Sequence, residues 1–396
     1  MSDKTRADIP RTVWALGFVS FFMDVSSESI HALLPLFLTT TLGASVALVG
    51  FIDGVAESTA AISKVFSGRL SDRLGRRKPL ILIGYGLGAA SKPLFAAATA
   101  PAVVFAARFA DRIGKGIRGA PRDALVADAA PEGVRGKAFG LRQALDTGGA
   151  VAGPVLAMAL MAVFSNDMRA VFWVAAVPAA IAVLFVVFGV EEKARVVDSD
   201  AATDPPARLK HLPDLGRAFW MVTTIGAAFT LARFSEAFLV LKANREGLPL
   251  AFAPAALVAM NLFYMLGAYP AGALADRTPP TSLLAWGLAA LVGADLLLAI
   301  TTGVPGAFAG IALWGVHMAL TQGLLAKMVA DAAPASLRGY AFGVYNFATG
   351  LSLLAASVIA GVLWDWRGPT ATFLAGAAFA SAAAALVLAF RRFEGR

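Results

Sequence analysis

The stretch VADAAPEGVRGKAFG, from Val126 to Gly140, returns as VADAAPASLRGYAFG from Val329 to Gly343. Eleven of the fifteen positions are identical, at a constant offset of 203 residues. A shorter match, GRLSDR at Gly68–Arg73 and GALADR at Gly272–Arg277, has an offset of 204. Because two separate segments repeat at almost the same spacing, the sequence predicts a duplicated protein made of two similar halves.

The composition around this repeat is that of a membrane protein. Of the 396 residues, 58% are hydrophobic and 15% are charged, and the mean hydropathy is +0.71. Soluble domains have about 45–50% apolar and about 25% charged residues. The absence of cysteine excludes disulfides and thiolate metal sites.

Apolar runs of about 20 residues, the length that spans a bilayer, occur six times in each half. They predict an all-α integral membrane protein with twelve transmembrane helices in two six-helix bundles, residues 1–190 and 218–396, joined by a cytoplasmic linker at 191–217. We expect the first run to be retained rather than cleaved as a signal peptide. The twelve segments are 12–39, 45–67, 79–99, 101–120, 137–164, 170–190, 218–241, 249–274, 282–302, 304–328, 340–363 and 370–390.

The positive charges follow the same division of the chain. With both termini in the cytoplasm, 24 of the 34 Lys and Arg residues fall in cytoplasmic segments and 4 in outer loops. This asymmetry satisfies the positive-inside rule, so the net charge of +8 reflects topology and not nucleic-acid binding. The remaining six lie at or near membrane depth: Lys64, Lys92, Arg108, Arg112, Arg142 and Arg233.

The segment GRLSDRLGRRK, Gly68 to Lys78, resembles the loop signature between the second and third helices of the major facilitator superfamily of secondary transporters. The resemblance covers nearly all of the chain. It implies alternating access by two rocking bundles, energy from a proton gradient, no catalysis, no cofactor and a monomer. The residues expected to form the gate are Gly68, Asp72, Arg73, Gly75, Arg76, Arg77, Gly149, Gly153, Pro154, Asp276 and Arg277.

The predicted fifth helix carries Gly140, Gly149 and Gly153-Pro154 at spacings that resemble the antiporter branch of the superfamily. The pattern departs from that branch at Ala157 and Met158, where a glycine pair would follow. Small residues also serve ordinary helix packing in membranes, which is the alternative interpretation.

The predicted first helix contains DVSSESIH, from Asp24 to His31, in which Asp24, Glu28 and His31 share one face. Charges facing lipid cost several kcal/mol, so this face is expected to border a protein interior or a watery cavity. In antiporters that the chain resembles, a fourth-helix arginine faces such a carboxylate, and Arg108 and Arg112 are the two candidates. The alternative is a structural pair, Arg108 with Asp111 or Asp111 with Lys115.

Asp24, Glu28, Arg108 and Arg112 are therefore the predicted proton-coupling residues. Arg233 and Glu236, three apart in the predicted seventh helix, either bind substrate or form an intrahelical pair. The predicted substrate-binding residues are His31, Asp111, Arg142, Asp146, Arg233, Glu236, Asn261, Tyr264, Trp314, His317 and Asn346, with no metal ligands.

These residues predict a proton antiporter of the bacterial cytoplasmic membrane, which exports a small amphipathic or cationic organic compound as a drug or metabolite. Its expected partners are this small molecule, protons and the lipid bilayer. Two alternatives remain open. One is a carrier of transition-metal ions or chelates that uses intramembrane His, Met and carboxylate ligands, and the other is a proton symporter for a small metabolite.

Overall fold

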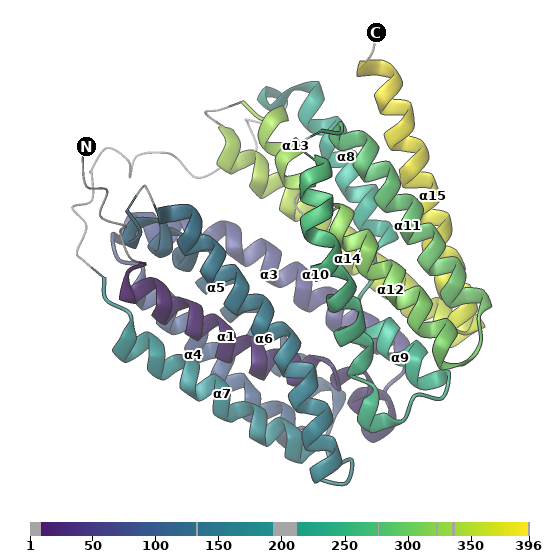
Figure 1. The fold of residues 1–396 in the computed structure, drawn as a ribbon, viewed down its shortest axis with the longest axis horizontal. Coiled ribbons are helices and arrows are strands. Elements are labelled where there is room, and N and C mark those ends of the chain that lie inside the picture. The colour runs from purple at the N-terminus through teal and green to yellow at the C-terminus, as the bar shows by residue number, and fades with distance from the viewer. Residues whose placement is uncertain are drawn as a thin grey trace. The chain divides into compact units, whose positions relative to one another are not determined.

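The computed structural model describes residues 9–131, 134–192, 212–275, 277–321, 324–334 and 337–394. These residues are helical throughout, apart from short turns and connections, and no strand occurs in the described ranges. Asp276 and most of the predicted linker lie outside them. Figure 1 follows the chain through the helices.

Two compact units share the helices, and α3 (Val46–Leu74) contributes to both. The first unit, Met1–His31 with Thr59–Asp204, contains α1 (Arg11–His31), α4 (Lys78–Ala97), α5 (Pro101–Ala129), α6 (Arg135–Val163) and α7 (Met168–Gly189). The second unit is Ala32–Ser58 with Pro205–Arg396. It contains α2 (Leu34–Leu36), η1 (Phe37–Thr41), η5 (Pro213–Leu215), α8 (Gly216–Ala232), α9 (Ala237–Arg245), η6 (Leu250–Phe252), α10 (Ala255–Ala275), α11 (Pro280–Ile300), α12 (Gly303–Thr321), α13 (Leu324–Ala332), α14 (Arg338–Arg367) and α15 (Pro369–Glu394).

The same set of helix pairs packs together in each unit. In the first, α1 packs against α6 and α7, and α4 packs against α5 and α7. In the second, α8 packs against α14 and α15, and α11 packs against α12 and α15. Each of these second-unit helices is the sequence counterpart of the corresponding first-unit helix, so the pairing pattern is duplicated together with the sequence.

The helices have the length and composition of membrane spans. Among the described residues, eleven helical segments are long and apolar enough to cross a bilayer. The twelfth predicted span corresponds to α5, which has 29 residues but carries the charged side chains Arg108, Asp111, Arg112, Lys115, Arg118, Arg122, Asp123 and Asp128. The fold is therefore the predicted all-α, multi-pass arrangement, and α5 is its most polar helix.

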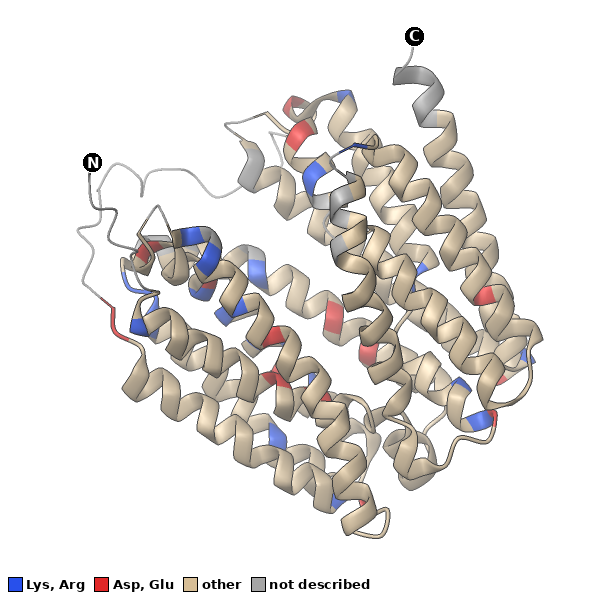
Figure 2. Cartoon of the chain, viewed as in Figure 1, with Lys and Arg blue, Asp and Glu red and all other residues tan. Residues whose placement is uncertain are grey.

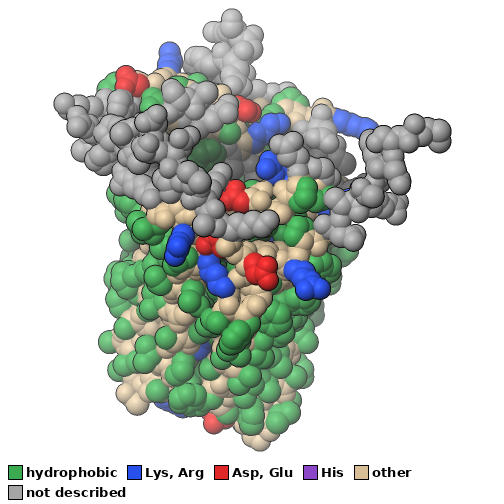
Figure 3. Space-filling view, turned by 90° about the vertical axis from the view of Figure 1, so that its left-hand side faces the viewer, with side chains coloured by type: hydrophobic (Ala, Val, Ile, Leu, Met, Phe, Trp, Pro, Cys, Tyr) green, Lys and Arg blue, Asp and Glu red, His purple; other side chains and the backbone are tan. Residues whose placement is uncertain are grey.

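The distribution of charge matches this arrangement. In Figure 2, coloured segments interrupt α5 along its length, whereas α7 and α15 are almost entirely tan. Figure 3 shows a face covered mainly by hydrophobic side chains, with charged side chains gathered above them. Large apolar side chains on α4 and α7 remain exposed, among them Ile83, Trp173, Val177 and Phe188. Such an exposed apolar surface suits contact with lipid tails.

Two helices differ from their predicted bounds in ways that affect the site. The fourth was predicted to end near residue 120, but α5 continues to Ala129, so Arg122 and Asp123 are helical instead of belonging to a loop. The seventh was predicted as continuous over 218–241. The structure instead breaks it between α8 and α9, with Arg233, Phe234 and Ser235 outside both helices. Apolar content predicts a span but does not detect such a break.

The beginning of α3 is held by side chains of the second unit. The carboxylate of Asp365 accepts hydrogen bonds from the backbone nitrogens of Val46 and Ala47 at 3.0 and 2.8 Å. These N–H groups have no partner within their own helix, so Asp365 caps α3 from the end of α14. Ser58 extends the contact by donating to the carbonyl of Gly350. The segment 46–58 therefore packs with the second unit, although the repeat places it in the first half.

A capping carboxylate outside the spans gives a pH-dependent prediction. Glu246 accepts hydrogen bonds from the Lys242 ammonium and, at 2.6 Å, from the Gly303 backbone nitrogen at the start of α12. The hydrogen bond from Lys242 is the main cause that lowers the pKa of Glu246 below its usual range. Because the pKa is lower in the folded state, this stabilisation is complete above the unfolded-state pKa. It is lost as pH falls through the folded-state pKa.

We expect Glu246→Gln to reduce the free energy of unfolding by about 1 kcal/mol at pH 7. The difference in free energy of unfolding between the variant and wild type should shrink as the pH falls from the unfolded-state pKa of Glu246 through its folded-state pKa. Melting temperatures of both proteins across the pH range measure it. An unchanged difference at acid pH would show that the charge of Glu246 has no part in the effect.

Candidate functional site

Two predicted carboxylates, Asp24 and Glu28, lie on α1 where it meets glycines of α6. A Cβ atom on Gly149 would stand 3.0 Å from the Cβ of Asp24, and one on Gly153 would stand 2.8 Å from the Cβ of Glu28. The missing side chains let the two helices approach closely. Both carboxylates remain partly exposed. They therefore combine a tightly packed backbone with residues that are not fully buried.

Asp111 forms a buried ion pair with a residue that was not predicted. The Lys92 ammonium on α4 lies 2.7 Å from the Asp111 Oδ1 and donates to the Ser27 hydroxyl on α1 at 2.9 Å. Lys92 is 1% exposed and Asp111 is 2% exposed, so the pair is removed from water. The charges of Arg112 and Arg118 also act on Asp111. The interpretation of Asp111 as a member of a structural ion pair is supported, with Lys92 as a partner that neither predicted pair, Arg108 with Asp111 or Asp111 with Lys115, contained.

The two candidate arginines of α5 have different surroundings. A terminal nitrogen of Arg108 lies 2.6 Å from the Nδ1 of His31, which links the ends of α1 and α5. Arg112 is buried on the next turn, where its charge faces Lys92 and Asp111. Among the contacts described, Arg108 therefore reaches the histidine of the DVSSESIH face, and Arg112 belongs to the surroundings of the ion pair.

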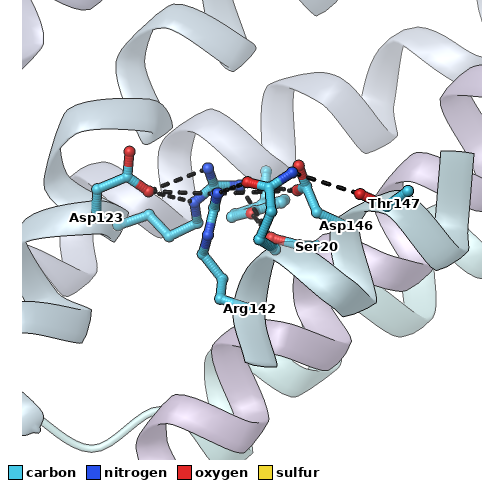
Figure 4. A network of polar contacts seen from close by, with 8 residues as sticks. Ser20, Asp123, Arg142, Asp146 and Thr147 are labelled. Carbon is cyan, nitrogen blue, oxygen red and sulfur yellow. Dashed lines mark hydrogen bonds and ion pairs between the residues drawn. The ribbon is translucent and has the colours of Figure 1, made fainter. Parts of the chain in front are cut away.

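A second polar network connects α5, α6 and α1. Arg122 lies 3.1 Å from Asp123 and 3.5 Å from Asp146, and it donates to the Ser20 hydroxyl at 2.9 Å. Arg142 lies 3.4 Å from Asp123 and 4.0 Å from Asp146. Figure 4 shows Arg142 between these two carboxylates. The predicted residues Arg142 and Asp146 are thus brought together, with Arg122 and Asp123 completing the network.

The buried charge of the first unit is mostly positive. Among the described residues of this unit, the side chains less than one-tenth exposed include one carboxylate, Asp111, and the cations Arg77, Lys92, Arg108, Arg112, Arg118 and Arg142. Arg118 stacks over the Tyr85 ring, with its guanidinium carbon 4.4 Å from the ring centre. Buried cations need negative partners nearby. The partly exposed carboxylates Asp123 and Asp146 supply that charge to Arg142, and Asp24 lies within the influence of Arg118.

The second unit contains the remaining predicted substrate residues in three places. Arg233 and Glu236 form an ion pair at 3.4 Å across the break between α8 and α9. Trp314 and His317 are fully buried in α12. His317 approaches the Gly287 carbonyl at 2.7 Å and stacks on Phe229. Trp314 packs edge-on against the His317 ring. These contacts give the Trp314 and His317 rings a packing role. Asn261, Tyr264 and Asn346 are partly exposed on α10 and α14.

The predicted gating residues are only partly described. Gly75 follows α3 with a positive φ of 62°, which favours glycine. Arg77 pairs with Asp128 at 3.0 Å, and its backbone nitrogen and that of Lys78 donate to Glu192. Gly68 faces Ala120, Pro154 lies inside α6, and Arg76 and Arg277 are exposed. The side chains of Asp72 and Arg73 lie outside the described part of the structure, as does Asp276.

Sequence reasoning missed Lys92, Arg118, Arg122 and Asp123 as members of the site. Lys92 was recognisable as a cation at membrane depth, but no pattern indicated its partner. Arg118 and Arg122 were assigned to a cytoplasmic segment because they lie in a basic run. The spacing of α5 contained a usable signal, because helical geometry puts six of its charged residues on one face: Arg108, Asp111, Arg112, Lys115, Arg118 and Arg122.

The two described histidines contact other groups of the protein. In the described ranges, no group of three or more His, Asp or Glu side chains is arranged to hold a metal ion. His31 contacts a guanidinium and His317 contacts a carbonyl. What the arrangement can do is exchange protons and bind a polar or charged solute at carboxylates backed by fixed positive charge.

Comparison with known proteins identifies similar chains. The family model described as Major Facilitator Superfamily matches residues 16–352 and 247–395. An uncharacterized MFS-type transporter of Methanocaldococcus jannaschii is 31% identical over 389 residues, which cover 96% of this chain and 95% of that protein. The gentisate transporter of Corynebacterium glutamicum is 30% identical over 350 residues, or 82% of this chain and 74% of that protein.

Two further similarities are more limited. The multidrug resistance protein MdtH of Photorhabdus laumondii is 30% identical over 161 residues, which cover 41% of this chain and 38% of that protein. A mutant of the nucleoside transporter NupG superposes with a TM-score of 0.79 at 15% identity, covering 96% of this chain and 99% of that one. At that identity the superposition shows a common fold.

Proposed function

The chain belongs to the Major Facilitator Superfamily and is a secondary transporter, not an enzyme, and from this premise we propose that it is a proton antiporter that exports a small amphipathic or cationic organic compound. The main support is the accessible acidic face of α1. Asp24 and Glu28 stay partly exposed while the buried charge behind them is mostly positive. A proton and a cationic or polar solute can compete for such carboxylates.

The proposed cycle is alternating access. The two sequence halves, residues 1–190 and 218–396, rock about the site as a monomer in the cytoplasmic membrane, with both termini inside and the proton gradient as the energy source. Coupling requires that proton and substrate compete for one site or favour opposite conformations, since a ligand shifts an equilibrium only by its differential affinity. Asp24 and Glu28 are the proposed titrating groups, with Arg108 and Arg112 of α5 as the proposed counter-charges. In this structure Arg108 contacts His31, Arg112 faces Lys92 and Asp111, and the α5 cations that act on Asp24 are Lys115 and Arg118.

Export by antiport is supported by the Gly149–Gly153–Pro154 pattern on α6 and by the partial similarity to a multidrug resistance protein. Proton symport of a metabolite is the second candidate, and the longer similarity to the gentisate transporter favours a metabolite as the substrate. The direction of proton movement separates the two. Substrate added to proteoliposomes moves protons in the opposite direction during antiport and in the same direction during symport.

The first experiment is a ligand search with the purified protein. Melting temperatures are measured against antibiotics, organic cations such as ethidium and tetraphenylphosphonium, and metabolites, at pH 5.5 and pH 8. A compound that binds the folded state raises the melting temperature by mass action. We expect stabilisation by an organic compound that weakens at the lower pH. Stabilisation only by Cu, Ni, Fe or Zn salts would contradict the proposal and favour the metal carrier.

The same compound then tests the carboxylates. We expect Asp24→Asn or Glu28→Gln to abolish pH-driven transport in proteoliposomes while the melting temperature stays near that of wild type, because each variant loses a group that can carry the proton. Asp167→Asn is the matched control, since Asp167 is an exposed N-cap of α7 and asparagine also caps helices. Undiminished pH-driven transport in both site variants would reject the assignment.

A further inference from the structure

Asp295 of α11 stands where the sequence repeat places Lys92 in the first unit. The offset of 203 residues relates these two positions, and it also relates Trp314 of α12 to Asp111, the ion-pair partner of Lys92. The second unit therefore has a carboxyl group in place of the ammonium and an indole in place of the carboxylate. The repeat has kept an ionisable group at the first position but not the opposite charge at the second.

The packing of the helix pairs repeats at the same offset. In the first unit, a Cβ on Gly114 of α5 would stand 2.5 Å from the Gly84 carbonyl oxygen of α4. His317 and Gly287 occupy the same two repeat positions in the second unit, and the His317 Nδ1 lies 2.7 Å from the Gly287 carbonyl oxygen. Because α11 and α12 meet in the register of α4 and α5, the sequence counterparts are also counterparts in the packing.

Asp295 is completely buried, with 0% of the residue exposed. Neither of its carboxyl oxygens has a hydrogen-bond partner among the described residues, and the Nε1 of Trp314 also has none. The Asp295 Oδ2 lies 2.5 Å from a Cβ placed on Gly376 of α15, and a ring carbon of Phe234 lies 2.8 Å from the same point. The carboxyl group is therefore packed beside a glycine and an aromatic ring.

The helices that pack on α11 are α12, α13 and α15. The one titratable residue of α12 is His317, which contacts the Gly287 carbonyl. The charged residues of α13 are exposed, and those of α15 stand at its end, roughly four turns beyond Gly376. In the break before α9, Arg233 forms its ion pair with Glu236. In the described part of the chain, no ion pair neutralises Asp295 as Lys92 neutralises Asp111. The charged residues of α13 and α15 are Lys327, Asp331, Arg391, Arg392 and Glu394.

An ionised carboxylate at this position would lose its hydration and gain neither a hydrogen bond nor a cation, whereas a neutral acid loses far less on burial. We infer that Asp295 is a protonated carboxylic acid, so that the second unit has a proton-binding site of its own. Its ligand is a single proton, held by a residue other than the proposed titrating groups Asp24 and Glu28. Proton binding at Asp295 does not rest on the proposed antiport.

Infrared difference spectroscopy of the full-length protein in lipid, wild type against Asp295→Asn, tests this site. A protonated carboxyl has a C=O stretching band that an ionised carboxylate lacks, and the missing hydrogen bonds keep this band at the high-frequency end of its region. We expect the band in wild type at both pH 5.5 and pH 8, and its loss in Asp295→Asn. Asp53→Asn is the matched control, because Asp53 is a buried aspartate of the same unit that accepts a hydrogen bond from Ser235 at 2.7 Å. The band should remain in this control.

Absence of the band from wild type would overturn the inference, as would its persistence in folded Asp295→Asn or its loss in Asp53→Asn. If Asp295→Asn does not fold, Gly376→Ala replaces it, since the new Cβ would press on the Asp295 Oδ2. That variant should shift the band, and an unshifted band would overturn the inference. None of these measurements follows transport, so failure of the proposed antiport and failure of the Asp295 site are distinguishable.

Discussion

Asp111→Asn is expected to lower the free energy of unfolding by about 3–5 kcal/mol, the usual cost of removing one partner from a buried ion pair. The variant leaves the Lys92 ammonium in a position that is 1% exposed, 2.7 Å from a side chain that no longer carries charge. Arg112 and Arg118 also act on Lys92 and would then repel it without compensation.

Replacing the other member of the pair, Lys92, is expected to lower the free energy of unfolding less than Asp111→Asn does. Lys92→Met leaves Asp111 buried but still close to the charges of Arg112 and Arg118. The double variant, Lys92→Met with Asp111→Asn, removes both charges and should recover most of the loss, because a neutral pair needs no charged partner. Unfolding in mixed micelles measures all four proteins as a double-mutant cycle. If the free energy of unfolding of Asp111→Asn lies within about 1 kcal/mol of the wild-type value, the pair is not buried as described.

Gly153→Ala is expected to lower the free energy of unfolding by about 2 kcal/mol. The added Cβ would stand 2.8 Å from the Cβ of Glu28, 2.9 Å from the Val25 carbonyl oxygen and 3.0 Å from the Ser29 nitrogen. Two of these three atoms belong to the α1 backbone, which cannot move aside as a side-chain tip could. The Ser29 hydroxyl also donates to the Gly153 carbonyl at 2.8 Å, and separation of the helices would lengthen this bond.

The same helix contains a matched control. Gly140 also lies in α6, but nothing stands within 4 Å of a Cβ placed on it. Gly140→Ala should therefore raise the free energy of unfolding, by up to about 1 kcal/mol, through helix propensity alone. Equal effects of the two substitutions would mean that helix propensity, and not the contact with α1, governs both positions.

The glycines of α6 illustrate what could be predicted from the sequence and what required the structure. Their spacing predicted small-residue packing, and the structure confirms close approach at Gly149 and Gly153. That Gly149 faces Asp24 and Gly153 faces Glu28 was not predictable. The sequence does not indicate which neighbouring helix packs against the glycine face of α6. That depends on how the helices are arranged in the fold. The antiporter interpretation of the pattern stays a prediction.

The charged residues give the opposite case. Arg233 and Glu236 form an ion pair, but in the break between α8 and α9 and not within one helix as their spacing of three had suggested. Lys92 and Asp111, nineteen residues apart on different helices, were both visible as ionisable groups but were not paired from sequence. The basic character of α5 was also misread beyond residue 120, because the composition of a buried polar helix resembles that of a cytoplasmic loop.

The sequence by itself determined the class of this protein: membrane-spanning helices, a duplicated architecture and a secondary transporter of the Major Facilitator Superfamily. The helices and the duplication follow from hydropathy and repetition, and the family follows from the resemblance of the Gly68–Lys78 segment to the family's loop signature. Only the tertiary structure decided which polar side chains meet, namely Lys92 with Asp111, Arg108 with His31, and Arg142 with Asp123. Those pairings depend on the rotation and register of one helix against another, and these are determined by packing over the whole contact surface of the helices and not by any local pattern.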